Sequence, residues 1–96
     1  MSDFYNEIIN KFGKDNQILK CVEELNELSQ ALCKFNSADS GEVTFEKVVE
    51  EIADVEIMLN QIKIILDISE SDVETMKNYK IMRTAKRYLG GFQLLK

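Results

Sequence analysis

The 96-residue sequence contains no histidine, no proline and no tryptophan, and only two cysteines. Without proline and with only four glycines, it has little of the turn chemistry that a β-sandwich or barrel needs between short strands. Zinc and redox sites lack their usual ligands, because histidine is missing and the cysteines form no C-x-x-C pair. Glutamate and lysine supply most of the 30% of residues that are charged, which favours continuous helices. The sequence therefore predicts an all-α protein.

The two cysteines, Cys21 and Cys33, fall in one segment with helical spacing. A helix would separate them by about 18 Å along its axis. That distance is far beyond the reach of a disulfide. We expect both to be buried, reduced thiols.

Charge and hydropathy limit the partners of the chain. A net charge of −5 repels phosphate backbones, so we expect no nucleic-acid partner. The segment 1–12 is acidic and amphipathic, unlike a signal peptide. The most apolar stretch, residues 55–68, holds five polar or charged side chains, too many for a membrane span. We expect a cytoplasmic protein with no membrane partner.

Apolar residues at helical intervals predict four helices in one domain covering residues 1–96. The predicted helices cover residues 3–12, 15–35, 43–68 and 69–89. Gly13 suits a left-handed helix end, whereas Asp15 and Ser69 are the expected N-caps of the second and fourth helices. The small polar residues 36–41 predict a turn, and Gly90 with Gly91 ends the last helix before a short tail.

The third predicted helix is apolar on nearly every side. A chain of 96 residues is too short to cover such a helix by itself. We therefore expect a helical bundle of about four helices per chain that is completed by oligomerisation, as a homodimer or a homotetramer.

A nine-residue pattern occurs twice in the sequence. KCVEELNEL, at residues 20–28, returns as KVVEEIADV at residues 47–55. Each copy has a lysine, then a pair of glutamates, then a further carboxylate three residues after the second glutamate. Two copies of one helical surface in adjacent helices can be related by an approximate two-fold axis, which brings the same faces together.

The repeat predicts where the carboxylates meet. In an antiparallel hairpin centred near Asp39, facing residues have numbers that add to about 78, because both helices rise equally per residue. Glu24 then faces Asp54, and Glu27 faces Glu51. Four carboxylates are expected to converge at one level of the hairpin.

The two members of each glutamate pair differ in direction, at about 100° per residue. Glu24 projects into the apolar stripe of its helix, whereas Glu23 points away from it. In the second copy Glu51 is the inward member and Glu50 the outward one. One carboxylate of each pair is therefore predicted to be solvated and the other to enter the site.

Four ionised carboxylates in a partly apolar site repel one another and lose hydration, which costs roughly several kcal/mol unless cations neutralise them. Ligands that are all carboxylate oxygens select hard ions, so we expect Mg²⁺, with Mn²⁺ as the alternative. The candidate ligands are Glu24, Glu27, Glu51 and Asp54. Glutamate pairs also decorate solvated helix faces without binding anything, and that alternative stays open.

The motifs EELNE, at residues 23–27, and EEIAD, at residues 50–54, resemble the EExxE and ExxD motif pair of the all-α NTP pyrophosphohydrolase superfamily. This superfamily includes MazG and the dimeric dUTPases. The resemblance extends over residues 17–87 and is strongest to the short MazG-like proteins of phages and bacteria. Some relatives hold the base between tryptophan rings, which this sequence lacks.

The resemblance implies a MazG-like helical bundle that hydrolyses a nucleoside triphosphate to a monophosphate and pyrophosphate with Mg²⁺. It assigns both the metal ligands and the catalytic carboxylates to Glu24, Glu27, Glu51 and Asp54. Larger relatives complete the site within one chain, so the resemblance also implies an oligomer. The rival interpretations are a catalytically silent bundle that binds a partner and a purely structural bundle without metal.

The fourth predicted helix carries five of the twelve basic residues. Positions 80, 83 and 87 form a single stripe at helical spacing. Lys77, Lys80 and Arg83 are the candidate contacts to the substrate's phosphates, with Arg83 able to grip two oxygens at once. The alternative is a solvated face that offsets the acidity of the chain. The tyrosines of this helix are expected to pack.

Overall fold

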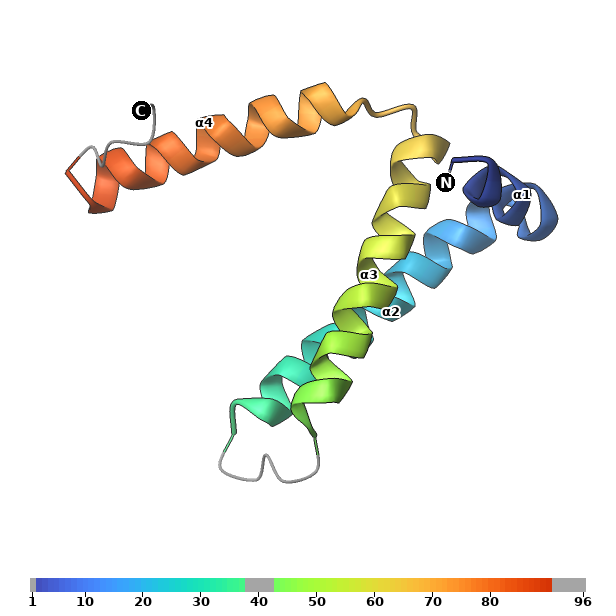
Figure 1. Cartoon of the computed structure of the whole chain (residues 1–96), viewed down its shortest axis with the longest axis horizontal. Helices are drawn as coiled ribbons and strands as arrows, with labels where there is room; N and C mark the ends of the chain where they lie inside the picture. Colours follow the sequence, from blue (N-terminus) through green and yellow to red (C-terminus); the bar gives the residue numbers. More distant parts are fainter. Residues whose placement is uncertain (1, 38–42, 91–96) are drawn as a thin grey trace.

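The computed structural model describes residues 2–37 and 43–90, which form four α-helices with no strand in these ranges (Figure 1). The helices are α1 (Ser2–Phe12), α2 (Lys14–Phe35), α3 (Phe45–Ile65) and α4 (Glu70–Tyr88). The predicted all-α class is confirmed, and the four helices are those expected from the apolar spacing. None of the described helices is long and apolar enough to cross a membrane.

A glycine separates α1 from α2. Gly13 has φ 93°, in the region that side chains with a Cβ rarely adopt, so the prediction of a glycine at this helix end is confirmed. Its ψ of 147° lies outside the left-handed helical conformation that was expected. Asp15 was expected to cap α2, but this prediction is wrong. The helix already begins at Lys14, which leaves Asp15 inside the first turn, where its charge favours the helix dipole.

Hydroxyl side chains cap the next two helices. The Thr44 hydroxyl accepts a hydrogen bond from the Lys47 backbone N–H at 3.2 Å and begins α3. The Ser69 hydroxyl accepts from the Asp72 N–H at 3.0 Å, which confirms the predicted cap of α4. Helix α3 ends at Ile65, before the predicted end at residue 68, because Asp67 takes a left-handed conformation with φ 55°.

Helices α2 and α3 form an antiparallel hairpin that holds most of the tertiary packing (Figure 1). Its buried residues recur at helical spacing and form a seam like that of a coiled coil. They are Gln17, Cys21, Glu24 and Ala31 on α2, and Glu51, Val55, Met58 and Gln61 on α3. The Gln17 amide donates a 2.7 Å hydrogen bond to the Gln61 amide oxygen. Their numbers add to 78, so the predicted register is confirmed.

Helix α1 folds back on the end of the hairpin opposite the α2–α3 connection (Figure 1). Ile9 supplies its buried contact. The Asn60 side-chain amide of α3 donates to the Tyr5 hydroxyl at 3.2 Å, which fixes α1 against the last turns of α3.

Helix α4 leads away from the hairpin, and in the described ranges it has no extensive contact with another helix (Figure 1). The radius of gyration, 17.0 Å, accordingly exceeds the roughly 12.5 Å expected of a compact chain of this length. An ion pair of 2.8 Å between Lys63 and Glu70 spans the α3–α4 connection. Tyr79 and Tyr88 are 60% and 70% exposed, so the expectation that they pack is wrong within one chain.

Both hairpin helices present an uncovered apolar stripe, and the two stripes repeat each other. They consist of Val22, Leu25 and Leu32 on α2, and of Val49, Ile52 and Leu59 on α3. Each α2 residue precedes its α3 counterpart by 27 positions, and the exposed fractions lie between 40% and 49% throughout. A two-fold relation between the copies places both stripes on one side of the hairpin. We call this surface the apolar face.

One of the two cysteines is buried and the other is exposed. Cys21 is buried in the seam and Cys33 is exposed, and both are free thiols. The expectation of two buried thiols is therefore wrong for Cys33, which lies outside the buried seam between α2 and α3. The predicted turn centre near Asp39, the second glycine Gly91 and the tail lie outside the described residues.

Candidate metal site

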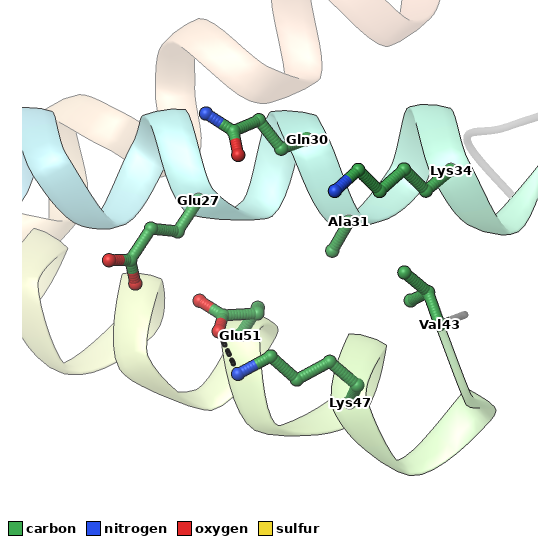
Figure 2. A pocket seen from close by; sticks show the side chains of 7 residues that line it. All are labelled: Glu27, Gln30, Ala31, Lys34, Val43, Lys47 and Glu51. Atoms are coloured by element: carbon green, nitrogen blue, oxygen red, sulfur yellow. Dashed lines mark ion pairs between the residues drawn. The ribbon is translucent and has the colours of Figure 1, made fainter.

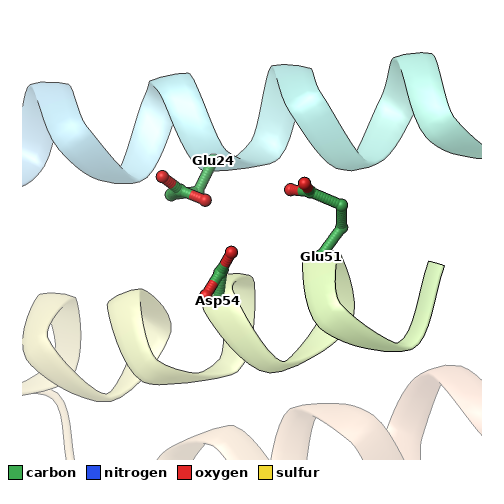
Figure 3. Close-up of side chains that lie close together, drawn as sticks. All are labelled: Glu24, Glu51 and Asp54. Atoms are coloured by element: carbon green, nitrogen blue, oxygen red, sulfur yellow. The ribbon is translucent and has the colours of Figure 1, made fainter. Parts of the chain in front are cut away.

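Three carboxylates converge between α2 and α3 (Figure 3). One oxygen of each of Glu24, Glu51 and Asp54 lies within 4.8 Å of the others. Glu24 is 7% exposed and Glu51 is 3% exposed, because both occupy seam positions, whereas Asp54 is half-buried at the seam's edge. The hairpin register thus brings three of the four predicted ligands together. We call these three residues the carboxylate cluster.

The outward members of the two glutamate pairs remain in solvent. Glu23 and Glu50 are exposed, although each directly precedes a buried glutamate. The predicted division of each pair into an inward and an outward carboxylate is confirmed. Adjacent residues diverge in this way because one step along an α-helix turns the side chain by about 100°.

Glu27, the fourth predicted ligand, is exposed and stands at the margin of the carboxylate cluster. Its pKa is raised, chiefly by the negative charge of Glu24, then by partial desolvation and by the charge of Glu51. Lys20 and Lys47 oppose this shift. The negative charges of Glu24 and Glu51 therefore act on Glu27 at the margin of the cluster, and such charges favour a cation nearby.

A lysine neutralises each buried glutamate from one turn earlier in its own helix. The Lys20 amine lies 3.2 Å from a Glu24 oxygen, and the Lys47 amine lies 3.0 Å from a Glu51 oxygen. These hydrogen bonds are the main reason that the pKa of each lysine is raised. The sequence prediction did not include these lysines in the site. Their spacing of four residues from an inward glutamate was the signal for this contact.

The second oxygen of Glu24 and that of Glu51 are buried, and neither has a hydrogen-bond partner in the described part of the chain. Leaving a buried polar atom unsatisfied costs about 1–3 kcal/mol, and more when the group is charged. A cation between the helices would satisfy both oxygens at once. The donor set, all carboxylate oxygen, fits a hard divalent ion such as Mg²⁺.

A cavity of about 210 Å³ opens between α2 and α3 beside Glu51 (Figure 2). Its lining combines both charges with a small apolar wall. The lining residues are Glu27, Gln30, Ala31, Lys34, Val43, Lys47 and Glu51. Sequence reasoning missed Gln30 and Lys34. They follow Glu27 by three and seven positions, so helical spacing could have assigned them to the same side of α2.

The basic candidates of α4 are not brought to the carboxylate cluster of their own chain. Lys77 pairs with Glu74 at 3.4 Å, and the Arg83 guanidinium lies 5.7 Å from the centre of the Tyr79 ring. Both are contacts within α4. Lys77 and Lys80 line a separate cavity of about 290 Å³ near the start of that helix.

Compared with models of protein families, with curated proteins and with solved structures, the chain has no match. The relation to MazG-like enzymes therefore remains a prediction from the paired carboxylate motifs.

Proposed function

We propose that the chain is a Mg²⁺-dependent nucleoside triphosphate pyrophosphohydrolase of the MazG-like type. It would convert an NTP or a dNTP and water to the monophosphate and diphosphate. The carboxylate cluster supports this proposal most strongly, because two of its buried oxygens meet no hydrogen-bond partner among the described residues. The order and spacing of the EExxE and ExxD motifs agree with the same activity.

Glu24, Glu51 and Asp54 would hold the metal through carboxylate oxygens. Bound Mg²⁺ supplies an acidified water and offsets charge on the reacting phosphates. Hydrolysis joins the water oxygen to the α-phosphorus and breaks the bond from that phosphorus to the bridging oxygen, so that pyrophosphate leaves. The water proton passes to a carboxylate and then to solvent. Asp54 and Glu27 are the acids nearest to solvent and can perform this transfer.

The apolar face supports self-association of the hairpin. Two copies that join these faces would bury both pairs of stripes in a four-helix arrangement. Leu25 and Glu27, two positions apart, point about 200° away from each other around α2. A second copy on the apolar face would thus leave the cavity beside Glu51 open to a nucleotide. We propose that the working species is a homodimer or a homotetramer.

One observation favours the rival interpretation, in which the chain is a catalytically silent bundle. Lys20 and Lys47 already neutralise part of the carboxylate cluster, so the hairpin can persist without a metal. Such a protein would keep the fold and its apolar face for partner binding.

An assay of both products tests the proposed activity. The purified protein is incubated with each of the common NTPs and dNTPs and Mg²⁺, and nucleotides and pyrophosphate are quantified after ion-exchange chromatography. We expect monophosphate and pyrophosphate in equal amounts from at least one nucleotide. Diphosphate with orthophosphate as products would refute cleavage between the α and β phosphates. No turnover of any nucleotide would favour the silent bundle.

Matched variants tie the activity to the site. Glu51→Gln should abolish pyrophosphate release, because it removes a buried cluster carboxylate. Glu50→Gln makes the same chemical change at the neighbouring exposed position and should retain the activity. Equal loss in both variants would mean that overall charge, and not the cluster, governs turnover.

A further inference from the structure

Lys20 and Lys47 hold equivalent places in the two copies of the repeat, and each engages the buried glutamate four residues later. In both pairs the amine contacts one carboxylate oxygen, and the other oxygen is the buried atom that no described residue satisfies. Both copies of the repeat therefore contain a buried glutamate, its lysine counterion and a carboxylate oxygen that no described residue satisfies. Because the lysine recurs together with the buried glutamate in both copies, we connect Lys20 and Lys47 with the cation site and not only with the stability of their helices.

The contacts of Lys20 and Lys47 with their glutamates have properties that would allow another cation to replace the lysines. The Lys20 and Lys47 side chains are 52% and 51% exposed, whereas those of Glu24 and Glu51 are 9% and 4% exposed. The lysines precede their glutamates, which is the weaker orientation for an ion pair on a helix. Lys47 also borders the 210 Å³ cavity, so its flexible stem can turn into open space without displacing a neighbour (Figure 2).

The charges of the site also favour replacement of the two lysine ammonium groups by one divalent cation. Glu24, Glu27, Glu51 and Asp54 carry four negative charges, and the two ammonium groups offset two of them. One divalent cation carries the same charge as these two ammonium groups together, so it can replace them without changing the net charge of the site. An ammonium is a single charge that touches the cluster from its solvent side. A divalent cation can bind the oxygens of several carboxylates at once, and so competes well for them.

We propose that Lys20 and Lys47 are exchangeable counterions of the metal site, which neutralise Glu24 and Glu51 before metal binds and are displaced when Mg²⁺ or Mn²⁺ enters. This inference rests on the proposed function only through its metal site. Lys47 lines the cavity together with Lys34, and displacement from Glu51 would free its amine on that side. Metal entry thus leaves two ammonium groups there for the anionic part of a nucleotide, and the site becomes attractive to a polyanion only after loading.

Competition predicts two effects of opposite sign when a lysine is removed. The metal-free protein loses a counterion for a buried carboxylate, so its melting temperature falls. Metal affinity rises, because the ion no longer has to displace an ammonium. A lysine that merely stabilised the helix, or that positioned the carboxylate for the metal, would leave the affinity unchanged or lower it.

The test is a calorimetric titration of the full chain with Mn²⁺ in the absence of nucleotide, combined with thermal unfolding of the metal-free form. We expect Lys47→Met to tighten Mn²⁺ binding by roughly twofold to fivefold, the range that partly exposed ion pairs span. Lys20→Met should act in the same direction but less, because Lys20 is shared with Glu23 at 3.6 Å. Lys47→Arg keeps the charge and should restore the weaker, wild-type affinity.

Lys63→Met is the control for net charge, since it removes an ion-paired lysine from the α3–α4 connection. It should lower the melting temperature without the gain in Mn²⁺ affinity. If Lys63→Met and Lys47→Met increase the Mn²⁺ affinity equally, the increase comes from the overall charge of the protein, and the proposed exchange is overturned. Unchanged or weaker Mn²⁺ binding by Lys47→Met would overturn it as well.

A measurement on the wild-type protein decides the question if the lysine variants fail to fold. The NMR signals of the Lys20 and Lys47 ε-methylene groups should shift on saturation with Mg²⁺, while those of Lys63 stay in place. Static signals at both positions would show that the ion pairs persist beside the metal, against the proposal.

The outcomes separate this inference from the proposed activity. Mn²⁺ binding with displaced lysines, in a protein that releases no pyrophosphate, would support the exchange and remove only the activity. A wild-type protein that binds no divalent ion would refute both.

Discussion

Glu24 and Glu51 are structural counterparts across the α2–α3 hairpin, each buried and each paired through one oxygen with a lysine four residues earlier. Their remaining oxygens both lie in the space between the helices, where no described residue donates to them. The sequence repeat thus appears in the fold as a nearly symmetric pair of half-sites. Asp54 adds its carboxylate from the second half-site.

Metal should stabilise the folded protein, because an ion that binds the native state alone shifts the unfolding equilibrium. At a free Mn²⁺ concentration of about 100 times the Kd, the gain is about 2.7 kcal/mol, and the melting temperature rises accordingly. Glu51→Gln should abolish this rise, and its metal-free form should be as stable as the wild type or more so, since repulsion within the cluster falls. Thermal unfolding followed by circular dichroism measures both effects. A strongly destabilised metal-free Glu51→Gln protein would assign the glutamate a structural role.

The chain should form a dimer or a larger oligomer at micromolar concentration, as measured by multi-angle light scattering. Ile52→Glu should shift it toward the monomer, because it places a charge on the apolar face. Ile57→Glu is the matched control, since Ile57 is 43% exposed, as Ile52 is at 42%, but projects from another side of α3. A monomeric wild-type protein, or equal effects of the two substitutions, would contradict the predicted interface.

The basic residues of α4 can contact a nucleotide at the carboxylate cluster only if α4 reaches another copy, because α4 leads away from its own hairpin (Figure 1). Arg83→Ala should then lower kcat/KM by about 2–3 kcal/mol while Mn²⁺ affinity stays unchanged. Glu24→Ala should lose metal binding and turnover together.

Mixing the Glu24→Ala and Arg83→Ala variants tests this arrangement across chains. If each site combines Glu24 of one chain with Arg83 of another, a randomised one-to-one mixture should recover about a quarter of wild-type turnover, since half of the dimers would contain one intact site. No recovery in a mixture that exchanges subunits would show that Arg83 acts elsewhere. Full loss of folding in Arg83→Ala would make Arg83 a structural residue.

The Lys63–Glu70 ion pair should make the α3–α4 connection sensitive to acid. Lys63 lowers the pKa of Glu70 below its usual value of 4.5, mainly through their hydrogen bond. The stabilisation is therefore present above pH 4.5 and disappears as the pH falls through the lowered pKa of Glu70. Carboxyl NMR titration should find the Glu70 pKa raised in Lys63→Met. An identical titration curve in that variant would contradict the ion pair.

Much of the site follows from periodicity alone. Glu23 and Glu24 are chemically identical neighbours, and helical rotation together with the position of the apolar stripe distinguished the buried one from the exposed one. The facing of Gln17 and Gln61 followed from equal rise in two antiparallel helices. These predictions succeeded because they depend on local geometry that every α-helix shares.

Other features had no such local basis. Cys33 has the same chemistry as Cys21 but lies on the exposed side of the hairpin, where none of the described helices covers it. The left-handed turn at Asp67 ends α3 earlier than the apolar pattern predicted, and the chain then departs in a new direction. The cavity contacts of Gln30 and Lys34 required the facing helix, with Val43 and Lys47, to be in place.

The sequence by itself determined the helices, the register of the hairpin and the level at which its carboxylates meet, because these depend on the regular rise and rotation of an α-helix. Only the tertiary structure decided that Glu27 stays at the margin of the cluster, that α4 leaves its own hairpin and that a whole apolar face remains uncovered. Those features depend on how side chains distant in the sequence share space, and on the angle at one short connection, which no local pattern specifies.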